Sequence, residues 1–75
     1  MKLSELQIGE VGVIKKINAK EPLKSKLLSM GFVKGAKVRV LKHTLAKNTF
    51  DIEVANTNVA LRSEEAAQVD VMKGS

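Results

Sequence analysis

The sequence predicts a small, mainly β domain, an SH3-like partly open barrel of about five short strands with one helix between the first two long strands. Two observations support this prediction. Apolar and polar residues alternate over five short segments, as in half-buried strands, whereas one longer segment has the three-to-four-residue period of a helix. The 75 residues include no cysteine, so a domain of this size must be stabilised by its apolar core alone.

The most informative stretch is residues 27–40, in which the helical period changes to the strand period across two glycines. A helix is predicted from about Pro22 to Met30, where the apolar stripe is formed by Leu23, Leu27 and Met30. Gly31 is expected to end it with a positive φ in a Schellman motif, and Gly35 to occupy the positive-φ position of a type II turn. This structural joint is made by Leu27, Met30, Gly31, Phe32 and Gly35.

The remaining elements are predicted from alternation and from turn residues. The expected strands span residues 11–17, 37–43, 50–55, about 59–61 and 69–71. Ser4 and Ser63 are expected to cap two short helical turns, one before the first strand and one before the last. A tight hairpin is predicted at Asn56-Thr57-Asn58, because asparagine tolerates left-handed backbone geometry.

Charge is distributed unevenly along the chain. Residues 1–47 contain 11 Lys or Arg and 3 acids, and residues 48–75 contain 2 and 5, so +8 and −3 give the net charge of +5. This surplus suits an acidic partner, anionic lipid headgroups or nucleic acid, although it also suits a surface that only keeps a small protein in solution.

No leader-like N-terminus and no long apolar run is visible, so we expect a cytoplasmic protein. Residues 1–73 are interpreted as one domain, and residues 74–75 as a frayed end or a cloning remnant.

The order and spacing of several short motifs extend over nearly the whole chain. They are Leu6 with Gly9 and Gly12, Leu27-Leu28, Met30-Gly31-Phe32 with Gly35, Val38 and Val40, and Leu61-Arg62 with Glu65-Ala66, Val69 and Val71. On these residues the chain resembles the FeoA family, the small cytoplasmic partners of the bacterial ferrous-iron transporter FeoB. It is also similar to the C-terminal SH3-like domain of DtxR-type repressors. Two positions depart from the family pattern, since Lys34 replaces a common proline and Asn56-Thr57-Asn58 lacks a frequent glycine.

The resemblance implies an accessory role in ferrous-iron transport, exerted by protein–protein contact with the transporter, and transition-metal binding at the family level. The chain itself offers few ligands, because His43 is its one histidine and the strand pair Asp51 and Glu53 lacks a clear third ligand. We therefore expect no metal site and no cofactor. His43 is interpreted as a polar residue at a strand end.

The sequence contains no recognisable catalytic motif. The stretch from Gly31 to Lys37 has the wrong spacing for a P-loop, and Gly9 to Gly12 is interpreted as a bend before a strand. The serines occupy capping positions and no nucleophile elbow accompanies His43. The sequence therefore predicts that the protein is not an enzyme.

Two binding functions remain open. A nucleic-acid-binding module is one, because Gly35 to Val40 is also similar to KOW-type domains. The basic residues that would contact a phosphate backbone are Lys15, Lys16, Lys24, Lys26, Lys37 and Arg39. The chain has no Tyr or Trp on which bases could stack, so nucleic acid is not the expected partner.

Contact with an FeoB-type transporter is the other binding function, and the one we predict. Leu28 lies 100° around the helix from Leu27 and outside the apolar stripe, so it is predicted to be exposed between Lys24 and Lys26. These three residues are the predicted partner contact, a small apolar patch with a basic rim. The alternative is that Leu28 widens the core face of the helix.

Overall fold

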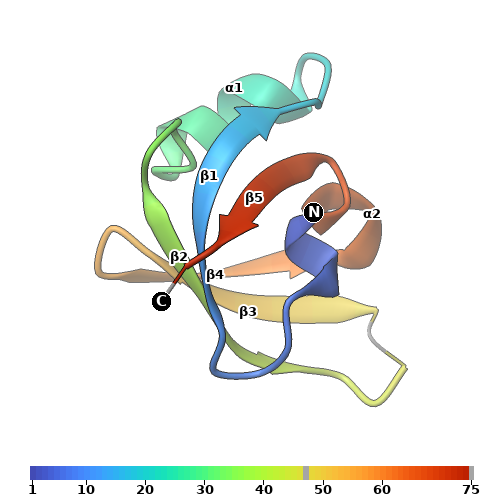
Figure 1. Cartoon of the computed structure of the whole chain (residues 1–75). Coiled ribbons are helices and arrows are strands. Elements are labelled where there is room, and N and C mark those ends of the chain that lie inside the picture. Colours follow the sequence, from blue (N-terminus) through green and yellow to red (C-terminus); the bar gives the residue numbers. More distant parts are fainter. Residues whose placement is uncertain (47, 75) are drawn as a thin grey trace.

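The computed structural model describes residues 1–46 and 48–74. In these residues, five antiparallel strands form one sheet in the order β4-β3-β2-β1-β5, which curls into a barrel (Figure 1). The strands are β1 (Val11–Ile17), β2 (Lys37–His43), β3 (Thr49–Val54), β4 (Thr57–Arg62) and β5 (Val69–Lys73). Strands β4 and β5 are the edges of the sheet, which confirms the predicted partly open barrel.

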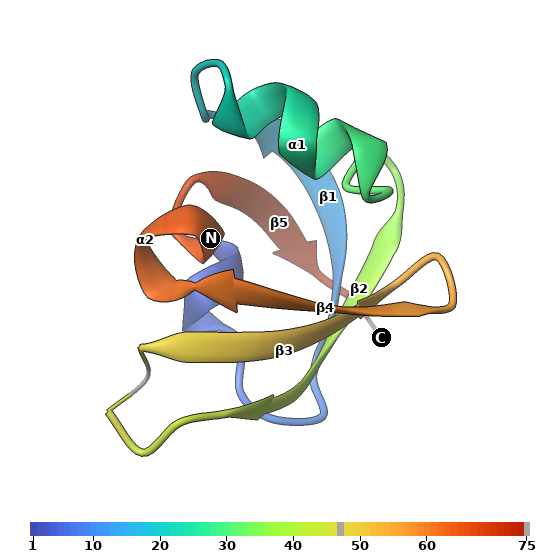
Figure 2. The same ribbon diagram turned by 180° about the vertical axis from the view of Figure 1, so that it is seen from behind.

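Three short helical elements accompany the sheet. Helix α1 (Leu23–Ser29) connects β1 with β2 and lies over one end of the barrel in both views, while α2 (Ser63–Ala66) lies between β4 and β5 (Figures 1 and 2). A 3-10 turn, η1 (Leu3–Glu5), precedes β1. Within the described part of the chain, no helix is long and apolar enough to cross a membrane.

The core is formed by the inward residues of the alternating strands. Strand β3 shows this clearly, since Phe50, Ile52 and Val54 are buried while the three residues between and before them are half-exposed. Phe32 and Leu27 are fully buried in the same cluster, and Leu23 and Met30 pack against it. The alternation and the helical stripe that the sequence predicts are both confirmed.

The joint has the predicted geometry. The N–H of Phe32 donates to the carbonyl of Leu27 and the N–H of Gly31 to that of Leu28, each at 3.1 Å, with Gly31 at φ +100°. These two bonds are the Schellman pair that satisfies carbonyls at a helix end. In the following turn, Gly35 has φ +90° and the chain closes by a bond of 3.0 Å from Ala36 N–H to the Val33 carbonyl. The helix starts at Leu23, one residue later than predicted.

The predicted hairpin position is wrong. Val54 pairs with Thr57, so the turn consists of Ala55 and Asn56, at φ +51° and +61°, and Thr57 already belongs to β4. A two-residue turn with positive φ at both positions matches the twist of the flanking strands, which a type I or II turn would splay apart.

The two serine caps are wrong as well. Ser4 lies inside η1 and Ser63 is the first residue of α2. In each case a glutamate later in the turn accepts a hydrogen bond from the backbone N–H of the residue that precedes the helix. Lys2 donates to Glu5 at 2.6 Å, and Arg62 donates to Glu65 at 2.8 Å. A carboxylate suits this place because the start of a helix carries unsatisfied N–H groups and partial positive charge.

The C-terminal residues are bound to the sheet. Lys73 ends β5, and the N–H of Gly74 donates to the carbonyl of Val11 at 2.7 Å. The expectation of a frayed end is therefore wrong for Gly74, and Ser75 lies outside the described residues.

Candidate interaction surfaces

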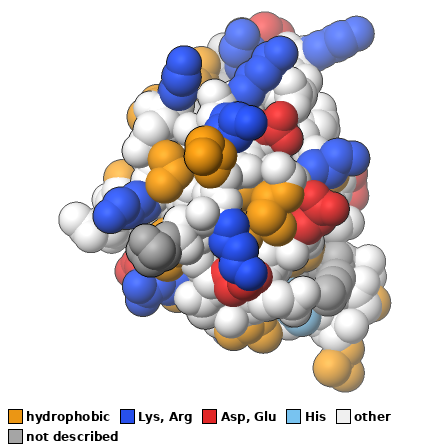
Figure 3. All heavy atoms as spheres, viewed as in Figure 1, with side chains coloured by type: hydrophobic (Ala, Val, Ile, Leu, Met, Phe, Trp, Pro, Cys, Tyr) orange, Lys and Arg blue, Asp and Glu red, His pale blue; other side chains and the backbone are white. Residues whose placement is uncertain are grey.

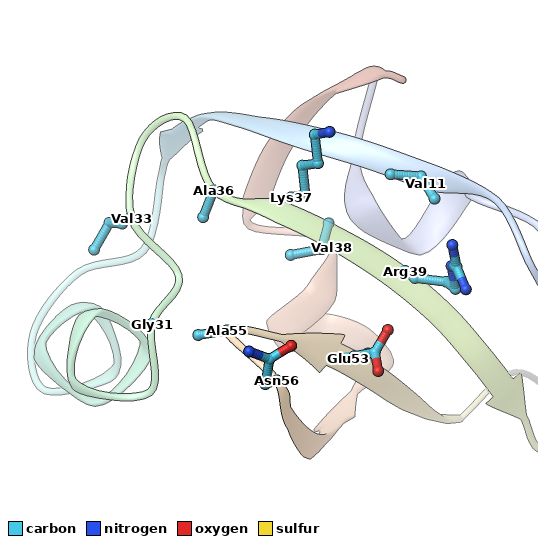
Figure 4. Close-up of a pocket in the computed structure, with 10 residues that line it drawn as sticks. All are labelled: Val11, Gly31, Val33, Ala36, Lys37, Val38, Arg39, Glu53, Ala55 and Asn56. Carbon is cyan, nitrogen blue, oxygen red and sulfur yellow. The ribbon is translucent and has the colours of Figure 1, made fainter. Parts of the chain in front are cut away.

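A groove of about 540 Å³ runs along β2, between the joint and the β3–β4 turn (Figure 4). Its apolar lining consists of Val11, Val33, Ala36, Val38 and Ala55. Lys37, Arg39 and Glu53 supply charge toward its rim, and Figure 4 shows Arg39 and Glu53 at the same end of the groove, from neighbouring strands. Val33 is 45% exposed, so a large aliphatic side chain here faces solvent.

The groove exists because two backbone features bring its sides together. Gly31 ends α1 at positive φ, and a Cβ built on it would lie 3.3 Å from the Cβ of Ala55. Ala55 and Asn56 form the two-residue β3–β4 turn, and both line the groove across from Gly31. The joint thus ends the helix and also places it close to the β3–β4 turn.

A second hollow of about 430 Å³ lies beside α1 and is much more basic. Its lining residues are Lys15, Lys16, Ile17, Lys24, Leu28 and Lys34, and we call it the lysine hollow. Leu28 is 40% exposed, which confirms that it lies outside the core.

The structure separates the three residues of the predicted partner contact. Lys24 and Leu28 both line the lysine hollow, whereas the Nζ of Lys26 lies 4.0 Å from Glu65, beside α2. Residues two apart on a helix point about 200° away from each other, so Lys26 could not share a face with both neighbours. Lys26 thus lies on another face of the helix from Leu28, and partner binding by Lys24, Lys26 and Leu28 stays a prediction.

The lysine hollow also contains residues that the partner prediction left out. The pairing of β1 with β5 shifts between Ile14 and Lys16, so Lys15 is an extra residue in a β-bulge. Strict alternation after the buried Ile14 would turn Lys16 inward, but the bulge leaves both lysines exposed. The sequence signal was the Lys-Lys pair itself, which breaks the alternation of the first strand.

Two carboxyl groups have lowered pKa values. A hydrogen bond from Lys73, together with the N–H of Gln7, holds the pKa of Glu10 below its ordinary value. Hydrogen bonding by Ser25 lowers the pKa of Glu21, which lies just before α1. Both groups stay ionised at neutral pH, since a hydrogen bond to the charged form favours it.

Of the residues considered for metal binding, His43 and Asp51 line one hollow, but each side chain already has a partner. The ring of His43 packs edge-on against Phe50 at 5.6 Å between centroids, and its Nδ1 lies 3.0 Å from the carbonyl of Thr44. Asp51 pairs with Lys42 at 3.5 Å. Among the described residues, no group of three or more His, Cys, Asp or Glu could hold a metal ion.

We expect the isolated protein not to bind Fe(II) tightly, because the described residues offer no group of three or more ligands, and one imidazole beside one carboxylate leaves most of the coordination shell of the ion to water. Isothermal titration calorimetry with Fe(II) under anaerobic conditions measures the affinity directly. Stoichiometric micromolar binding that His43→Ala abolishes would contradict the expectation.

Comparison with known proteins gives consistent matches. Residues 1–73 match the model of the FeoA domain family. A Campylobacter jejuni protein, provisionally named Fe(2+) transport protein A, is 37% identical over 71 residues, covering 95% of this chain and 96% of its own. A Porphyromonas gingivalis Fe(2+) transport protein A/Fe(2+) transporter FeoB fusion protein is 32% identical over 95% of this chain, which corresponds to 8% of the fusion.

Solved structures agree with the family match. The zinc complex of Stenotrophomonas maltophilia FeoA, described as a procaryotic SH3 domain protein, superposes with a TM-score of 0.86 at 32% identity. The match covers 96% of this chain and 89% of that one. The predicted SH3-like fold is therefore confirmed.

Proposed function

The chain belongs to the FeoA family, and we propose that it is a cytoplasmic accessory protein of ferrous-iron uptake that binds the cytoplasmic part of an FeoB-type transporter. The relative in which an Fe(2+) transport protein A and FeoB are joined in one polypeptide carries this proposal. Joining two proteins in one chain holds them at a high effective concentration, which favours a functional contact between them. The protein then supports the activity or assembly of the transporter by contact, without covalent chemistry.

We assign the contact with FeoB to the groove along β2. Its volume is within the usual range of about 300–1,000 Å³ for sites that enclose a ligand group. An apolar floor with charged residues at the rim is also the composition of a modest protein–protein interface. Val33 at the lip, with Ala36 and Ala55 on the walls, would receive an apolar side chain of the transporter.

Replacing Val33 by serine is expected to weaken binding to the isolated cytoplasmic part of FeoB about 5–30-fold, the equivalent of roughly 1–2 kcal/mol for a modest apolar anchor. The melting temperature should change little, because Val33 is 45% exposed. Calorimetric titration gives the affinity and a thermal melt checks the fold.

Leu28→Ser is the matched control, since Leu28 is a similarly exposed aliphatic residue on the other side of the joint, at 40%. It should bind like the unmodified chain. Weakening by Leu28→Ser alone would instead place the contact on α1, at Leu28 and the lysines beside it. Absence of binding by the unmodified chain would overturn the proposed function itself.

A further inference from the structure

The lysine hollow collects positive charge from three parts of the chain. Lys15 and Lys16 come from the end of β1, Lys24 from α1, and Lys34 from the turn before β2. In Figure 3, basic side chains crowd the part of the surface where Figure 1 places α1. Leu28 lies among these cations with 40% of its surface exposed, and Ile17 adds a half-buried apolar side chain.

Hardly any negative charge offsets these cations. Within residues 1–46 and 48–74, Lys26, Lys42 and Lys73 each have a carboxylate within 4.0 Å, and none of the four lysines of the hollow does. Glu21 lies near the start of α1, where its carboxylate accepts the N–H of Ser25 at 3.0 Å and is attracted to Lys24 without forming an ion pair within 4.0 Å. Most of the charge of the lysine hollow is thus available to an anionic partner.

The kind of cation indicates the kind of partner. Arginine has a planar fork that pairs with a single carboxylate or phosphate in two places at once, whereas lysine is a hydrated point charge on a flexible stem. Arg39 and Arg62, the two arginines of the chain, lie outside the hollow. Point charges around an exposed leucine suit a diffuse, laterally mobile array of negative charge with an apolar layer beneath it, which is the surface of an anionic bilayer.

We propose that the lysine hollow binds the surface of an anionic phospholipid membrane, with the four lysines among the lipid phosphates and Leu28 at the boundary of the acyl chains. Val33 lines the groove while its neighbour Lys34 lines the hollow, so the two surfaces meet at the joint. The protein can therefore touch lipid and an integral membrane partner at the same time. This surface extends the protein's role beyond the contact with FeoB, because lipid binding requires no transporter.

The test is flotation of the protein with lipid vesicles that contain no FeoB. Vesicles of phosphatidylglycerol and phosphatidylcholine in equal parts should bind the protein, and vesicles of phosphatidylcholine alone should not. Binding should fall steeply with salt, since charges beyond about 8–10 Å are screened at ordinary ionic strength. Equal binding to both kinds of vesicle would overturn the proposal.

The decisive variant replaces Lys15, Lys24 and Lys34 by glutamine, and its matched control replaces Lys2, Lys37 and Lys42. Both triple variants have a net charge three units below the +5 of the chain, so a difference in their binding does not come from net charge. The hollow variant should lose binding on the order of 100-fold, about five-fold per lysine, and the control far less. An equal loss in both would show that net charge, rather than the hollow, attracts the membrane.

Nucleic acid is the competing partner for a basic surface. A single-stranded DNA oligonucleotide should bind the protein weakly and respond equally to both triple variants. Tight oligonucleotide binding that only the hollow variant loses, with no vesicle binding, would assign the hollow to nucleic acid and overturn the proposal. Failure of the vesicle experiment leaves the calorimetric measurement of FeoB binding untouched, so the two proposals fail separately.

Discussion

Phe50→Ala and Phe32→Ala are each expected to leave little folded protein. Both side chains are buried, at 1% and 0% exposure, in a core that holds the whole domain together. Truncating a buried phenylalanine costs roughly 3–5 kcal/mol, whereas a domain of this length has a total free energy of unfolding of about 4–11 kcal/mol. Urea unfolding followed by far-UV circular dichroism measures both quantities.

Leu45→Ala is the control for the phenylalanine variants. Leu45 lies in the loop after β2 with its side chain fully in solvent, at 105% exposure, so its truncation should not change the unfolding midpoint. If both phenylalanine variants unfold cooperatively near the midpoint of the unmodified chain, the barrel does not depend on this core, and the account of the fold is wrong.

Gly31→Ala is expected to destabilise the domain more than Gly35→Ala. Both glycines have positive φ, at +100° and +90°, and a left-handed backbone costs an L-residue roughly 1–2 kcal/mol. A Cβ on Gly35 would meet nothing within 4 Å, but one on Gly31 would lie 3.3 Å from the Cβ of Ala55. The close contact adds to the backbone strain only at Gly31.

A double-mutant cycle with Ala55→Gly separates the two causes, because this change removes the contact but not the strain at Gly31. The double variant Gly31→Ala/Ala55→Gly should lose less unfolding free energy than the two single variants lose together. The expected difference is about 0.5–1 kcal/mol, the low end of couplings between residues in contact. Urea titrations give the unfolding free energies of the unmodified chain, the two single variants and the double variant. Additive effects and equal costs at the two glycines would show that the contact is energetically unimportant.

Periodicity predicted most of the fold, because burial on one face fixes where side chains of a strand or helix point. Phe50, Ile52 and Val54 alternate inward as expected, and Gly31 and Gly35 have the positive φ that their positions required. The wrong predictions concern turns, where a shift of one residue along the chain costs little free energy. Asn56 was identified as a turn residue, but nothing in the sequence showed that Ala55 would share the left-handed geometry with it.

The candidate surfaces were harder to predict, since they depend on contacts between distant segments. The helical angle put Leu28 outside the apolar stripe but left open whether it was exposed or widened the core face, and its 40% exposure decides for the first. The gathering of Lys15 and Lys16 with Lys34 depends on a bulge and on the placement of α1, neither of which follows from a local pattern. The groove is set by the approach of Gly31 to a turn more than twenty residues later.

The assignment of the groove to the transporter is tested most directly by chemical-shift mapping. The 15N-labelled protein is titrated with the unlabelled cytoplasmic part of FeoB, without lipid, and the backbone amides are followed. If the groove binds FeoB, the shifts concentrate on the residues that line it, which include Gly31, Val33, Ala36, Ala55 and Asn56. Shifts confined to the lysine hollow, or none at saturating concentration, would contradict this assignment.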